Sequence, residues 1–564
     1  MPECPEDKAE VAPPPDAPAG KAPPPLPLGA HGSSKDGGLT RHLSLFDLIC
    51  IGVGGTVGSG IFVLCGLIAR TRAGPATFIS WAIAGIAATL SGFCCAELSG
   101  KIPRAGSAYS YASVTVGEYA AFLAAACLTL NYVGSAGAVA RSWGDKVVHW
   151  MREEWGDAHW AVRVCDPGYG VNTMAFAVSL GSMLLLLKGV QESKAIANAF
   201  TAMKVALVLF MIVMGLTLTD ASNLSPLIPP EFGISGVFRG ATSCFFGYIG
   251  FDEACCLAGE AKDPQRNMPR AVLWTISIVT TLYMLAALVL TGMQPYTEIS
   301  VESGFPDAFR ANGADWAVQI SSWGEIITLP IVVLISLLAQ PRLQWAVAKD
   351  GLIPPVFAEV DERGNLWKGT LYSGVVMVII ATFVPFTYLD DTISTGILLA
   401  FCITNWSVVS LRIERPEKDE DVGVFRHPLD IDALMLSFNA LSLMSGLLAV
   451  HGTGSAIGRA SFAAATAGLC GLLFAILRLP RFDVRCDGSH YHGPGVPLLP
   501  CLGTYVNWYL VAQLEVAGIC LLLMYLGLAS AFYLAYGVRH SLGRRKWRGW
   551  KEYEAEGGGG NLYF

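Results

Sequence analysis

The sequence predicts an all-helical, polytopic membrane protein with fourteen spanning helices, two of which are unwound at mid-membrane. Its 564 residues are 53% hydrophobic and only 15% charged, which is too apolar and too long for one water-soluble core. Apolar runs of about 20 residues, the length needed to cross a bilayer, recur along the chain between short polar links. Two of these runs contain helix-breaking sequences, near residues 51–62 and 246–253.

The predicted spans cover most of the chain after residue 43. Lysine and arginine concentrate on alternate links, and because positively charged links stay in the cytoplasm, both ends of the chain are expected there. The net charge of −7 adds little, because orientation depends on where the basic residues lie. The fourteen segments lie near 44–70, 75–98, 116–147, 172–190, 194–218, 236–262, 269–292, 315–345, 369–387, 391–412, 430–451, 459–478, 497–514 and 516–538.

The sequence divides into six expected parts. Proline, alanine and glycine dominate its beginning, a composition that cannot bury a core. The final residues resemble a linker and a protease-site remnant, so they are excluded from the fold. The parts are a disordered cytoplasmic tail (1–40), a ten-helix inverted-repeat core (43–412), a cytoplasmic loop (413–429), helices eleven to fourteen (430–541), a basic cytoplasmic tail (542–555) and the remnant (556–564).

The first interruption, at residues 51–62, places five glycines in nine positions of an apolar segment. Each glycine weakens a helix by about 1 kcal/mol relative to alanine, so the helix should unwind there. Free backbone groups at this depth persist only where protein or a watery cavity satisfies them. The amides of Gly58, Ser59 and Gly60 then suit a carboxylate, and the carbonyls near Thr56 suit an ammonium group. Such a site fits an amino acid zwitterion, although a glycine-rich run can also serve close helix packing alone.

The second interruption lies in the sixth span, around Phe246, Ile249 and Asp252. Broken helices at positions one and six are the pattern expected of two five-helix halves that are inverted copies of each other. A substrate is then expected at mid-membrane, between the two interruptions.

Ionisable side chains inside predicted spans are the other candidates for function. Lys204 lies well inside the fifth span, where a lysine costs at least a few kcal/mol, so it should pair with carbonyls or a carboxylate unless it snorkels to water. Glu325 lies in the outer third of the eighth span, either in a pocket or at a water-filled mouth. Glu97 and Asp252 each serve either a structural bond or a functional role.

Several short motifs carry a resemblance that covers nearly everything from Leu43 to about Ser541. They are GSGIFVL (58–64), AEL (96–98), PRAGSAY (103–109), TVGE (115–118), YIGFD (248–252), GEAKDPQRNMP (259–269), PR (341–342) and KDGL (349–352). With these motifs the sequence resembles the cationic amino acid transporters of the amino acid–polyamine–organocation superfamily. Each motif is weak by itself, and together they are specific.

The resemblance implies a LeuT-type fold, with two inverted five-helix repeats and four additional helices, that carries its substrate by alternating access. By analogy with the superfamily, the substrate carboxylate would meet the amides of residues 58–60. The amino group would meet carbonyls near Thr56, Phe246 and Ile249, and the Phe246 ring would act as a gate over the pocket.

The resemblance also suggests how transport is coupled. Lys204 looks like a fifth-helix lysine that, in some relatives, takes the place of a sodium ion and braces the first helix. A fixed cation bonded to unwound carbonyls does what bound sodium would do, so sodium coupling is not expected and proton coupling stays open. Proton coupling requires a group that titrates during the cycle, and the candidates are Lys204, Asp252 and Glu97.

The residues that would set side-chain selectivity depart from the family pattern. On the third helix, Asn131 stands where some relatives carry an acid before the tyrosine. A cationic substrate needs an acid, carbonyls or an aromatic face at its far end, and Glu325 could supply the acid. Arginine and lysine are therefore the favoured substrates. The alternatives are neutral or broad-range amino acid transport, and an amino acid receptor that does not transport.

Several functions and partners are not expected. No nucleophile, metal-ligand set or nucleotide loop stands out, so the sequence predicts neither an enzyme nor a cofactor or metal site. Nothing in it indicates nucleic-acid binding. The expected partners are an amino acid, the lipid bilayer and, in a coupled cycle, protons, while the oligomeric state stays open. The plasma membrane is favoured over an internal membrane.

Overall fold

A computed structural model describes residues 41–542 except 158, 168–169, 189–193, 302, 362–364, 414–430, 453, 480–490 and 515. The predicted tail at 1–40 and the remnant at 556–564 lie outside the described residues. So do all but the first residue of the predicted loop at 413–429 and of the basic tail at 542–555. Every regular element of the described chain is a helix, and no β-strand occurs in it.

Each predicted span coincides with one helix or with a pair of helix fragments. Nine helical stretches of the described residues are long and apolar enough to cross a membrane, and the first of them, Leu45–Lys101, contains two predicted spans. The helices are α1 (Leu45–Thr56) with α2 (Cys65–Ile68), α3 (Thr77–Lys101), α5 (Glu118–Trp155), α7 (Thr173–Leu187), α8 (Lys194–Thr217), α9 (Gly233–Cys244) with α10 (Phe251–Cys256), α11 (Pro264–Met293), α13 (Asp315–Lys349), α14 (Trp367–Phe383), α15 (Phe386–Arg412), α16 (Ile431–Leu447), α17 (Ala456–Leu477), α18 (Leu498–Ala512) and α19 (Val516–Phe532). The all-helical, polytopic class is confirmed, and the inverted arrangement of fourteen spans stays a prediction.

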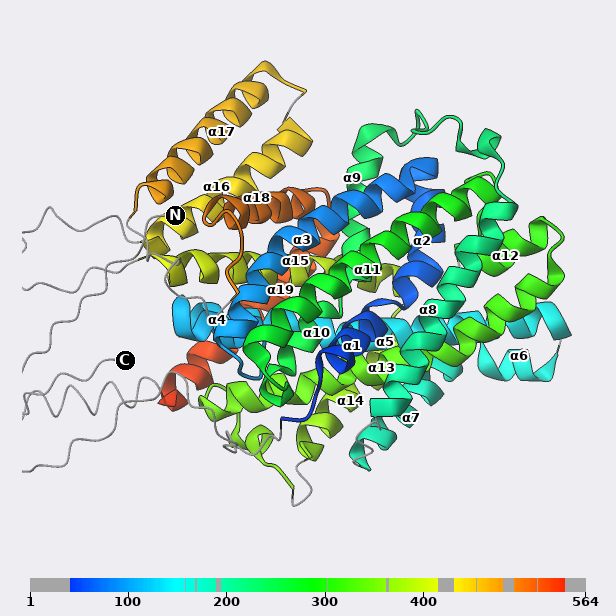
Figure 1. Ribbon diagram of the computed structural model, residues 1–564, viewed down its shortest axis with the longest axis horizontal. Helices are drawn as coiled ribbons and strands as arrows, with labels where there is room; N and C mark the ends of the chain where they lie inside the picture. Colours follow the sequence, from blue (N-terminus) through cyan, green and yellow to red (C-terminus); the bar gives the residue numbers. More distant parts are fainter. Residues whose placement is uncertain are drawn as a thin grey trace, which may run out of the picture. The chain divides into compact units, whose positions relative to one another are not determined.

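The short first helix lies among the helices that surround the two interruptions. α1 packs against α8, α10, α11 and α13, while α5 packs along both α13 and α15. Figure 1 shows these helices side by side. Their facing sides form one continuous apolar core, rich in alanine, valine, leucine and phenylalanine. The first interruption is therefore held inside protein.

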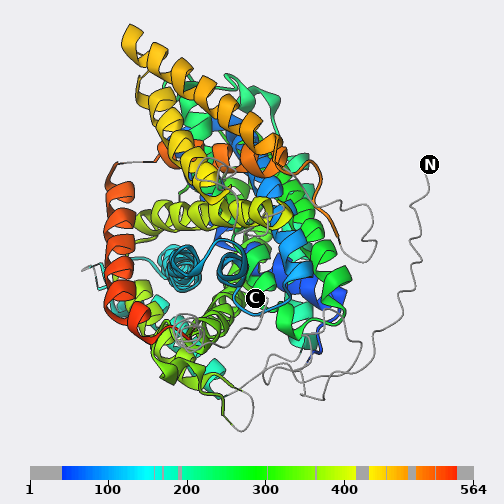
Figure 2. The same ribbon diagram turned by 90° about the vertical axis from the view of Figure 1, so that its left-hand side faces the viewer.

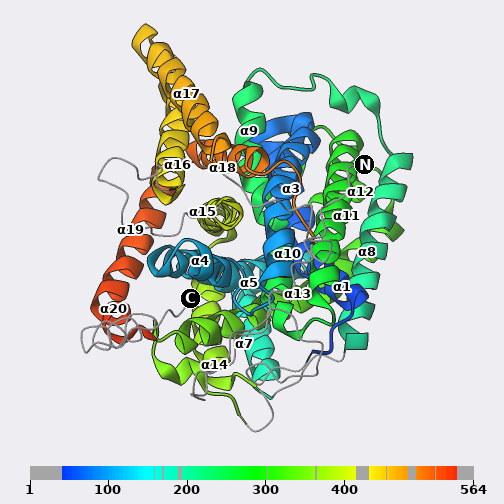
Figure 3. The same ribbon diagram turned by 60° about the vertical axis from the view of Figure 1, so that its left-hand side comes forward.

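The helices near the C-terminus form a second, smaller core. α16, α17 and α18 bury apolar residues against the end of α15. In Figures 2 and 3 the hairpin of α16 and α17 projects away from the helices around α1. This separation leaves α1, α5, α8, α10 and α13 as the elements that can build a central site.

The first interruption is present where the sequence predicts it. α1 ends at Thr56, and Val57 adopts an extended conformation with ψ of 102°. The second half begins with one π-helical turn, Gly60–Leu64, and continues into α2. The prediction that the first helix unwinds is confirmed.

The second interruption is built differently. α9 continues into a single 3-10 turn, Phe245–Tyr248, after which Ile249 is extended with ψ of 131°. Gly250 then turns the chain into α10 with φ of 135°, a conformation that strains any residue with a side chain. The prediction that the sixth helix unwinds is confirmed as well.

Candidate functional site

The two interruptions are in direct contact. A Cβ atom built on Gly60 would lie 2.7 Å from the Cα of Gly247, and one built on Gly250 would lie 2.5 Å from the amide nitrogen of Thr56. Both distances are shorter than real Cβ contacts, so the backbones meet this closely only because these positions are glycine. The glycines that weaken the helix therefore also allow the two broken helices to touch.

A pocket lies where the interruptions meet. In this conformation it is nearly closed, with a cavity volume of about 10 Å³, which is room for about one water molecule. Its lining residues are Gly55, Thr56, Gly58, Ser59, Gly60, Ser135, Val139, Phe246, Ile249, Val332 and Ser336. All six positions predicted from the two interruptions are among them. From α5 and α13 the sequence analysis singled out Asn131 and Glu325, whereas the lining residues of those helices are others, because small residues such as Ser135 and Ser336 do not stand out in the sequence.

Hydrogen-bond donors lie on one side of the first interruption. Ser59 and Gly60 begin the second half of the helix, where backbone amides have no intrahelical acceptor, and no side chain caps them. The Ser59 hydroxyl is buried and has no hydrogen-bond partner among the described residues. An anionic group placed here would accept hydrogen bonds from all three.

Thr56 supplies acceptors to the same pocket. The Thr56 carbonyl accepts a hydrogen bond of 2.6 Å from the Tyr283 hydroxyl, and the Thr56 hydroxyl donates to the Gly52 carbonyl, also at 2.6 Å. Because a carbonyl oxygen has two lone pairs, Thr56 can still accept from an ammonium group. Donors and acceptors are thus both present in one small pocket, as a zwitterion requires.

The Phe246 ring closes one wall of the pocket. Its side chain is buried, and the ring packs edge to face against Phe386 at the start of α15, with the centroids 5.5 Å apart. A rotation of this aromatic pair would open the wall. The gating role of Phe246 stays a prediction.

Lys204 pairs with a backbone carbonyl, one of the two partners that its depth predicts. Its side chain is fully buried on α8, and Nζ donates a hydrogen bond of 2.7 Å to the carbonyl of Gly54. Gly54 belongs to the last turn of α1, where carbonyls lack intrahelical donors. The ammonium group therefore ties α8 to the end of the first half-helix.

Asp252 and Asn131 bind each other. The Asn131 amide donates to Asp252 at 3.3 Å, and the other carboxylate oxygen accepts from the Gly250 amide at 3.3 Å. Both side chains are buried, and neither lines the pocket. Asp252 thus braces the turn at Gly250 and joins α10 to α5, while Asn131 does not face a substrate in this conformation.

Glu97 is engaged far from the pocket. Arg412 donates to both of its oxygens, at 2.8 and 2.6 Å, Lys101 donates at 3.1 Å, and the Gly493 amide donates at 2.8 Å. These bonds hold the end of α3 to the end of α15. Of the two roles open to Glu97, the geometry favours the structural one.

Glu325 forms a buried ion pair. Its carboxylate lies 2.5 Å from the Lys146 ammonium, and Lys146 also donates to the Phe62 carbonyl at 3.0 Å. The pair joins α13 and α5 to the second half of the first helix. Glu325 does not line the pocket between the interruptions in this conformation, and its contact with a substrate stays a prediction.

Comparison with known proteins identifies the family. A family model described as "Amino acid permease" matches residues 43–477, and one described as "C-terminus of AA_permease" matches residues 491–541. The chain belongs to the amino acid permease family. Since this is a family of membrane transporters, the permease is a multi-pass membrane protein, in agreement with its apolar helices.

Individual relatives agree with this assignment. Cationic amino acid transporter 4, vacuolar, of Arabidopsis thaliana is 32% identical over 559 residues, covering 89% of this chain and 93% of the relative. Cationic amino acid transporter 4 of Homo sapiens is 30% identical over 569 residues, covering 90% and 89%. A methylthioribose transporter of Bacillus subtilis (strain 168) is 37% identical over 390 residues, covering 68% and 84%. The resemblance to the cationic amino acid transporters is confirmed.

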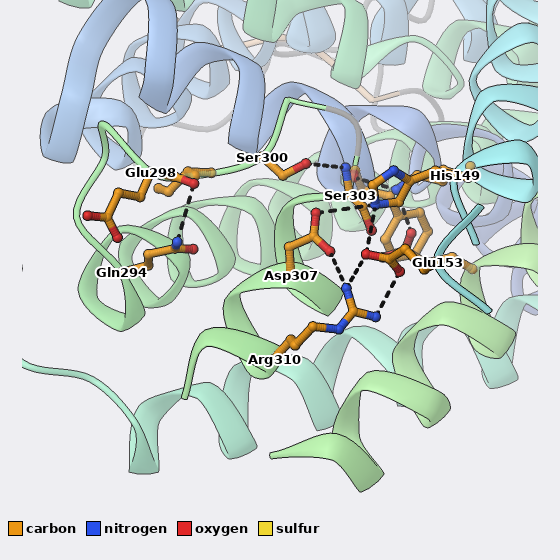
Figure 4. Close-up of polar contacts among 12 residues, drawn as sticks. His149, Glu153, Gln294, Glu298, Ser300, Ser303, Asp307 and Arg310 are labelled. Atoms are coloured by element: carbon orange, nitrogen blue, oxygen red, sulfur yellow. Dashed lines mark hydrogen bonds and ion pairs between the residues drawn. The ribbon is translucent and has the colours of Figure 1, made fainter. Parts of the chain in front are cut away.

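A charged cluster lies next to the Lys146–Glu325 pair in the permease. His149 Nε2 is 3.4 Å from Glu153 and 3.5 Å from Asp307, which belongs to the short helix α12 (Gly304–Ala311). Figure 4 shows these three side chains pointing toward one another, with Arg310 bonded to both carboxylates. The three donor atoms lie close enough to hold a metal ion. Because Arg310 already compensates the two carboxylates, we interpret the cluster as an ionic latch. We call this side of the pocket the α12 end.

The pKa of Asp307 reflects this latch. Burial alone would raise the pKa, but hydrogen bonds from His149 and Ser300, and the charges of His149 and Arg310, outweigh burial and lower it below its ordinary value. The carboxylate is therefore the favoured form of Asp307 in the folded permease.

The opposite side of the pocket is closed by other contacts, and we call it the Arg342 end. Arg342 Nε donates to Glu260 at 2.7 Å. Backbone hydrogen bonds join Leu43, just before α1, to Glu260 and Lys262, just after α10, at 3.0 and 2.8 Å. The chain entering the first broken helix is thus bound to the chain leaving the second.

Sequence reasoning missed Glu253. It is 1% exposed, and its Oε2 lies 2.6 Å from the position that a Cβ atom on Gly55 would occupy. Gly55 lines the pocket, so this carboxylate lies directly behind the pocket wall. The only available signal was a second acid next to Asp252, and two adjacent acids at the start of a half-helix are also a common N-terminal pattern.

Proposed function

We propose that this permease is a secondary transporter that moves amino acids by alternating access, with the pocket between the two broken helices as its substrate site. The observation that carries the proposal is that donors and an acceptor line the same pocket. The amides that start the second half-helix have no side-chain cap, the Ser59 hydroxyl has no hydrogen-bond partner among the described residues, and the Thr56 carbonyl has a lone pair to spare. A substrate carboxylate would meet the donors and its α-ammonium group the carbonyl, with the Phe246 ring as gate.

The fold that we propose for this cycle has two inverted five-helix repeats followed by four helices. In such a fold, one bundle rocks against the other around the fixed site. Interruptions at the first and sixth helices, and their direct contact, support this arrangement. Contacts at the α12 end and at the Arg342 end would break in alternation.

We propose that transport does not require sodium. Lys204 places a fixed positive charge on the Gly54 carbonyl, the kind of backbone group that coordinates sodium in transporters with broken helices. A sodium ion at this position would be repelled by the ammonium group. Proton coupling stays part of the proposal.

Cationic amino acids are the first substrates to test. The cationic amino acid transporters among the relatives support arginine and lysine. No charged side chain lines the pocket, which favours a second candidate, a neutral or broad-range substrate. The relative named as a methylthioribose transporter also points to uncharged substrates.

Uptake by the purified protein in liposomes tests these proposals. Labelled arginine, lysine and leucine are supplied with sodium or choline, with and without a pH gradient. We expect saturable uptake of at least arginine, unchanged when choline replaces sodium. Specific binding without flux or exchange would instead support the amino acid receptor. Uptake that requires sodium would refute the role given to Lys204.

We propose the plasma membrane as the location, with both chain ends in the cytoplasm. The relatives are named for several compartments, including vacuolar and chloroplastic forms, so their names do not decide the location. Imaging of a C-terminal fluorescent fusion beside organelle markers tests it. Labelling an added terminal tag in intact and permeabilised cells tests the orientation.

A further inference from the structure

Glu253 is the second acid of α10, and it faces the first broken helix. Its carboxylate packs against Gly55 from behind the pocket, with its Oε2 2.6 Å from the Cβ position of that glycine. One residue earlier in the chain, the Gly54 carbonyl accepts from Lys204. The end of α1 is thus contacted by an acid and a base at successive residues.

The charges around this point do not balance. Asp252, Glu253 and Lys204 are each 1% exposed or less, so two acids and one base share the buried interior. The oxygens of Asp252 accept hydrogen bonds from Asn131 and Gly250. Neither oxygen of Glu253 accepts a well-formed hydrogen bond from the described residues.

Each element packed against Glu253 contributes a different group. The Lys204 ammonium comes from α8, the Tyr132 hydroxyl from α5, and the Ser336 hydroxyl, a pocket group, from α13. Asp252 is its neighbour on α10, and α1 presents only backbone. No second base is present among these groups, so one negative charge is uncompensated when both acids are ionised. An uncompensated buried charge is strongly unfavourable.

We propose that Glu253 is the proton-carrying group of this permease. Its carboxylate takes up one proton from water while the pocket is open to the side from which the substrate enters, and it keeps this proton while the pocket is closed at both ends, which removes the surplus charge. When the pocket opens to the other side, α1 moves away from α10, water reaches the carboxyl group, and the proton leaves to that side. The ionised carboxylate then pairs with Lys204, which keeps its own proton throughout.

This inference rests on the proposed transport function and adds the residue that couples it to protons. One proton enters with the substrate from one side and leaves with it on the other, so the step is balanced. Asp252 is not assigned this role, because its two hydrogen-bond donors already stabilise its charge.

The test uses the full-length protein in liposomes. Two fluxes are measured for the wild type and for Glu253→Gln: accumulation of labelled arginine driven by an inward proton gradient, and exchange of labelled for unlabelled arginine without a gradient. Glutamine imitates the protonated glutamic acid, so we expect the variant to keep exchange and to lose gradient-driven accumulation. A pH dye inside the liposomes should report arginine-induced proton entry for the wild type only. Glu118→Gln is the matched control, since this glutamate bonds to Tyr533 and Ser541 away from the pocket, and it should keep both fluxes.

The results distinguish a failure of the transport proposal from a failure of the role proposed for Glu253. If the wild type neither accumulates nor exchanges any amino acid, the transport proposal fails. If the wild type transports and Glu253→Gln still accumulates arginine on a proton gradient, or if the wild type itself ignores the gradient, the transport proposal stands and the role of Glu253 is refuted.

A measurement on the wild type covers the case in which Glu253→Gln does not fold. Dicyclohexylcarbodiimide reacts with protonated carboxyl groups in apolar surroundings. We expect it to inhibit transport and to label the Glu253 side chain, as located by fragmenting the labelled peptide in a mass spectrometer, with less labelling at high pH. Inhibition with the label on Asp252 or elsewhere would overturn the proposal.

Discussion

The two ends of the pocket are closed by contacts of different kinds. At the α12 end, the side chains of Lys146 and Glu325 are only 4% and 2% exposed, and their ammonium and carboxylate groups lie 2.5 Å apart. At the Arg342 end, Arg342 and Glu260 are 19% and 8% exposed, and the closure is shared with backbone hydrogen bonds at Leu43.

This difference indicates which end resists opening. Separating a buried ion pair leaves two charges that must be hydrated again, whereas a partly exposed pair exchanges protein for water at little cost. The Arg342 end should therefore open more readily when the pocket is empty. Lys204 lies between the two ends and holds the half-helix on which both depend.

The largest effect is expected from breaking the α12 end. In Glu325→Gln, the Lys146 ammonium loses its buried carboxylate partner, and removing one partner of a buried ion pair costs about 3–5 kcal/mol. We expect a lower unfolding temperature and faster labelling of a cysteine placed at Ser303 by an impermeant reagent. Arginine and leucine uptake should fall equally, because Glu325 does not line the pocket.

The double variant Lys146→Met/Glu325→Leu is the control for this prediction. Replacing both members of a buried pair with apolar residues leaves no unpaired charge, so most of the lost stability should return. If Glu325→Gln weakens arginine uptake and leaves leucine uptake unchanged, Glu325 contacts the substrate side chain, as the sequence suggested.

The next largest effect is expected from removing the Lys204 ammonium group. Lys204→Met leaves the Gly54 carbonyl buried without its donor, which costs about 1–3 kcal/mol. We expect transport to fall by about 10- to 100-fold while the protein still folds, because each 1.4 kcal/mol corresponds to a factor of ten. Uptake and thermal unfolding are measured together, with the exposed Lys188→Met as control. Normal flux with normal pH dependence would remove Lys204 from the mechanism.

A smaller effect is expected at the Arg342 end. Arg342→Gln removes a partly exposed ion pair, worth about 1 kcal/mol or less, while the backbone bonds at Leu43 remain. Stability should change little, and a cysteine at Ala261 should become more reactive from that side. A loss of stability as large as that of Glu325→Gln would show that the two ends do not differ in this way.

The sequence predicted the features that depend on local chemistry. Both helix interruptions follow from glycine residues, whose backbone freedom weakens a helix within a few residues. The burial of Lys204 follows from its depth in an apolar run, and a buried ammonium group restricts the choice of partners. These arguments need no knowledge of which helices are neighbours.

The sequence could not predict pairings between distant helices. Asn131 was expected to face a substrate and instead bonds to Asp252, 121 residues away. The sequence placed Glu325 inside a predicted span. Its partner Lys146 lies at the end of another predicted span, where a lysine does not indicate a buried partner. Only the packing of α5 against α13 brings the two together.

The smallest predicted effect concerns the latch at Asp307, which can be weakened by pH alone. The pKa of Asp307 in the folded protein is lowered, so its contribution to stability is complete above the pKa of the unfolded chain, about 3.9. It is lost as the pH falls through the lower folded value. The difference in unfolding temperature between the wild type and Asp307→Asn should therefore shrink as the pH falls below about 4. Asp220→Asn is a control, since that carboxylate also has a lowered pKa but bonds only to Ser222 at the surface. A difference that grows on acidification would mean that Asp307 does not stabilise the α12 end through its charge.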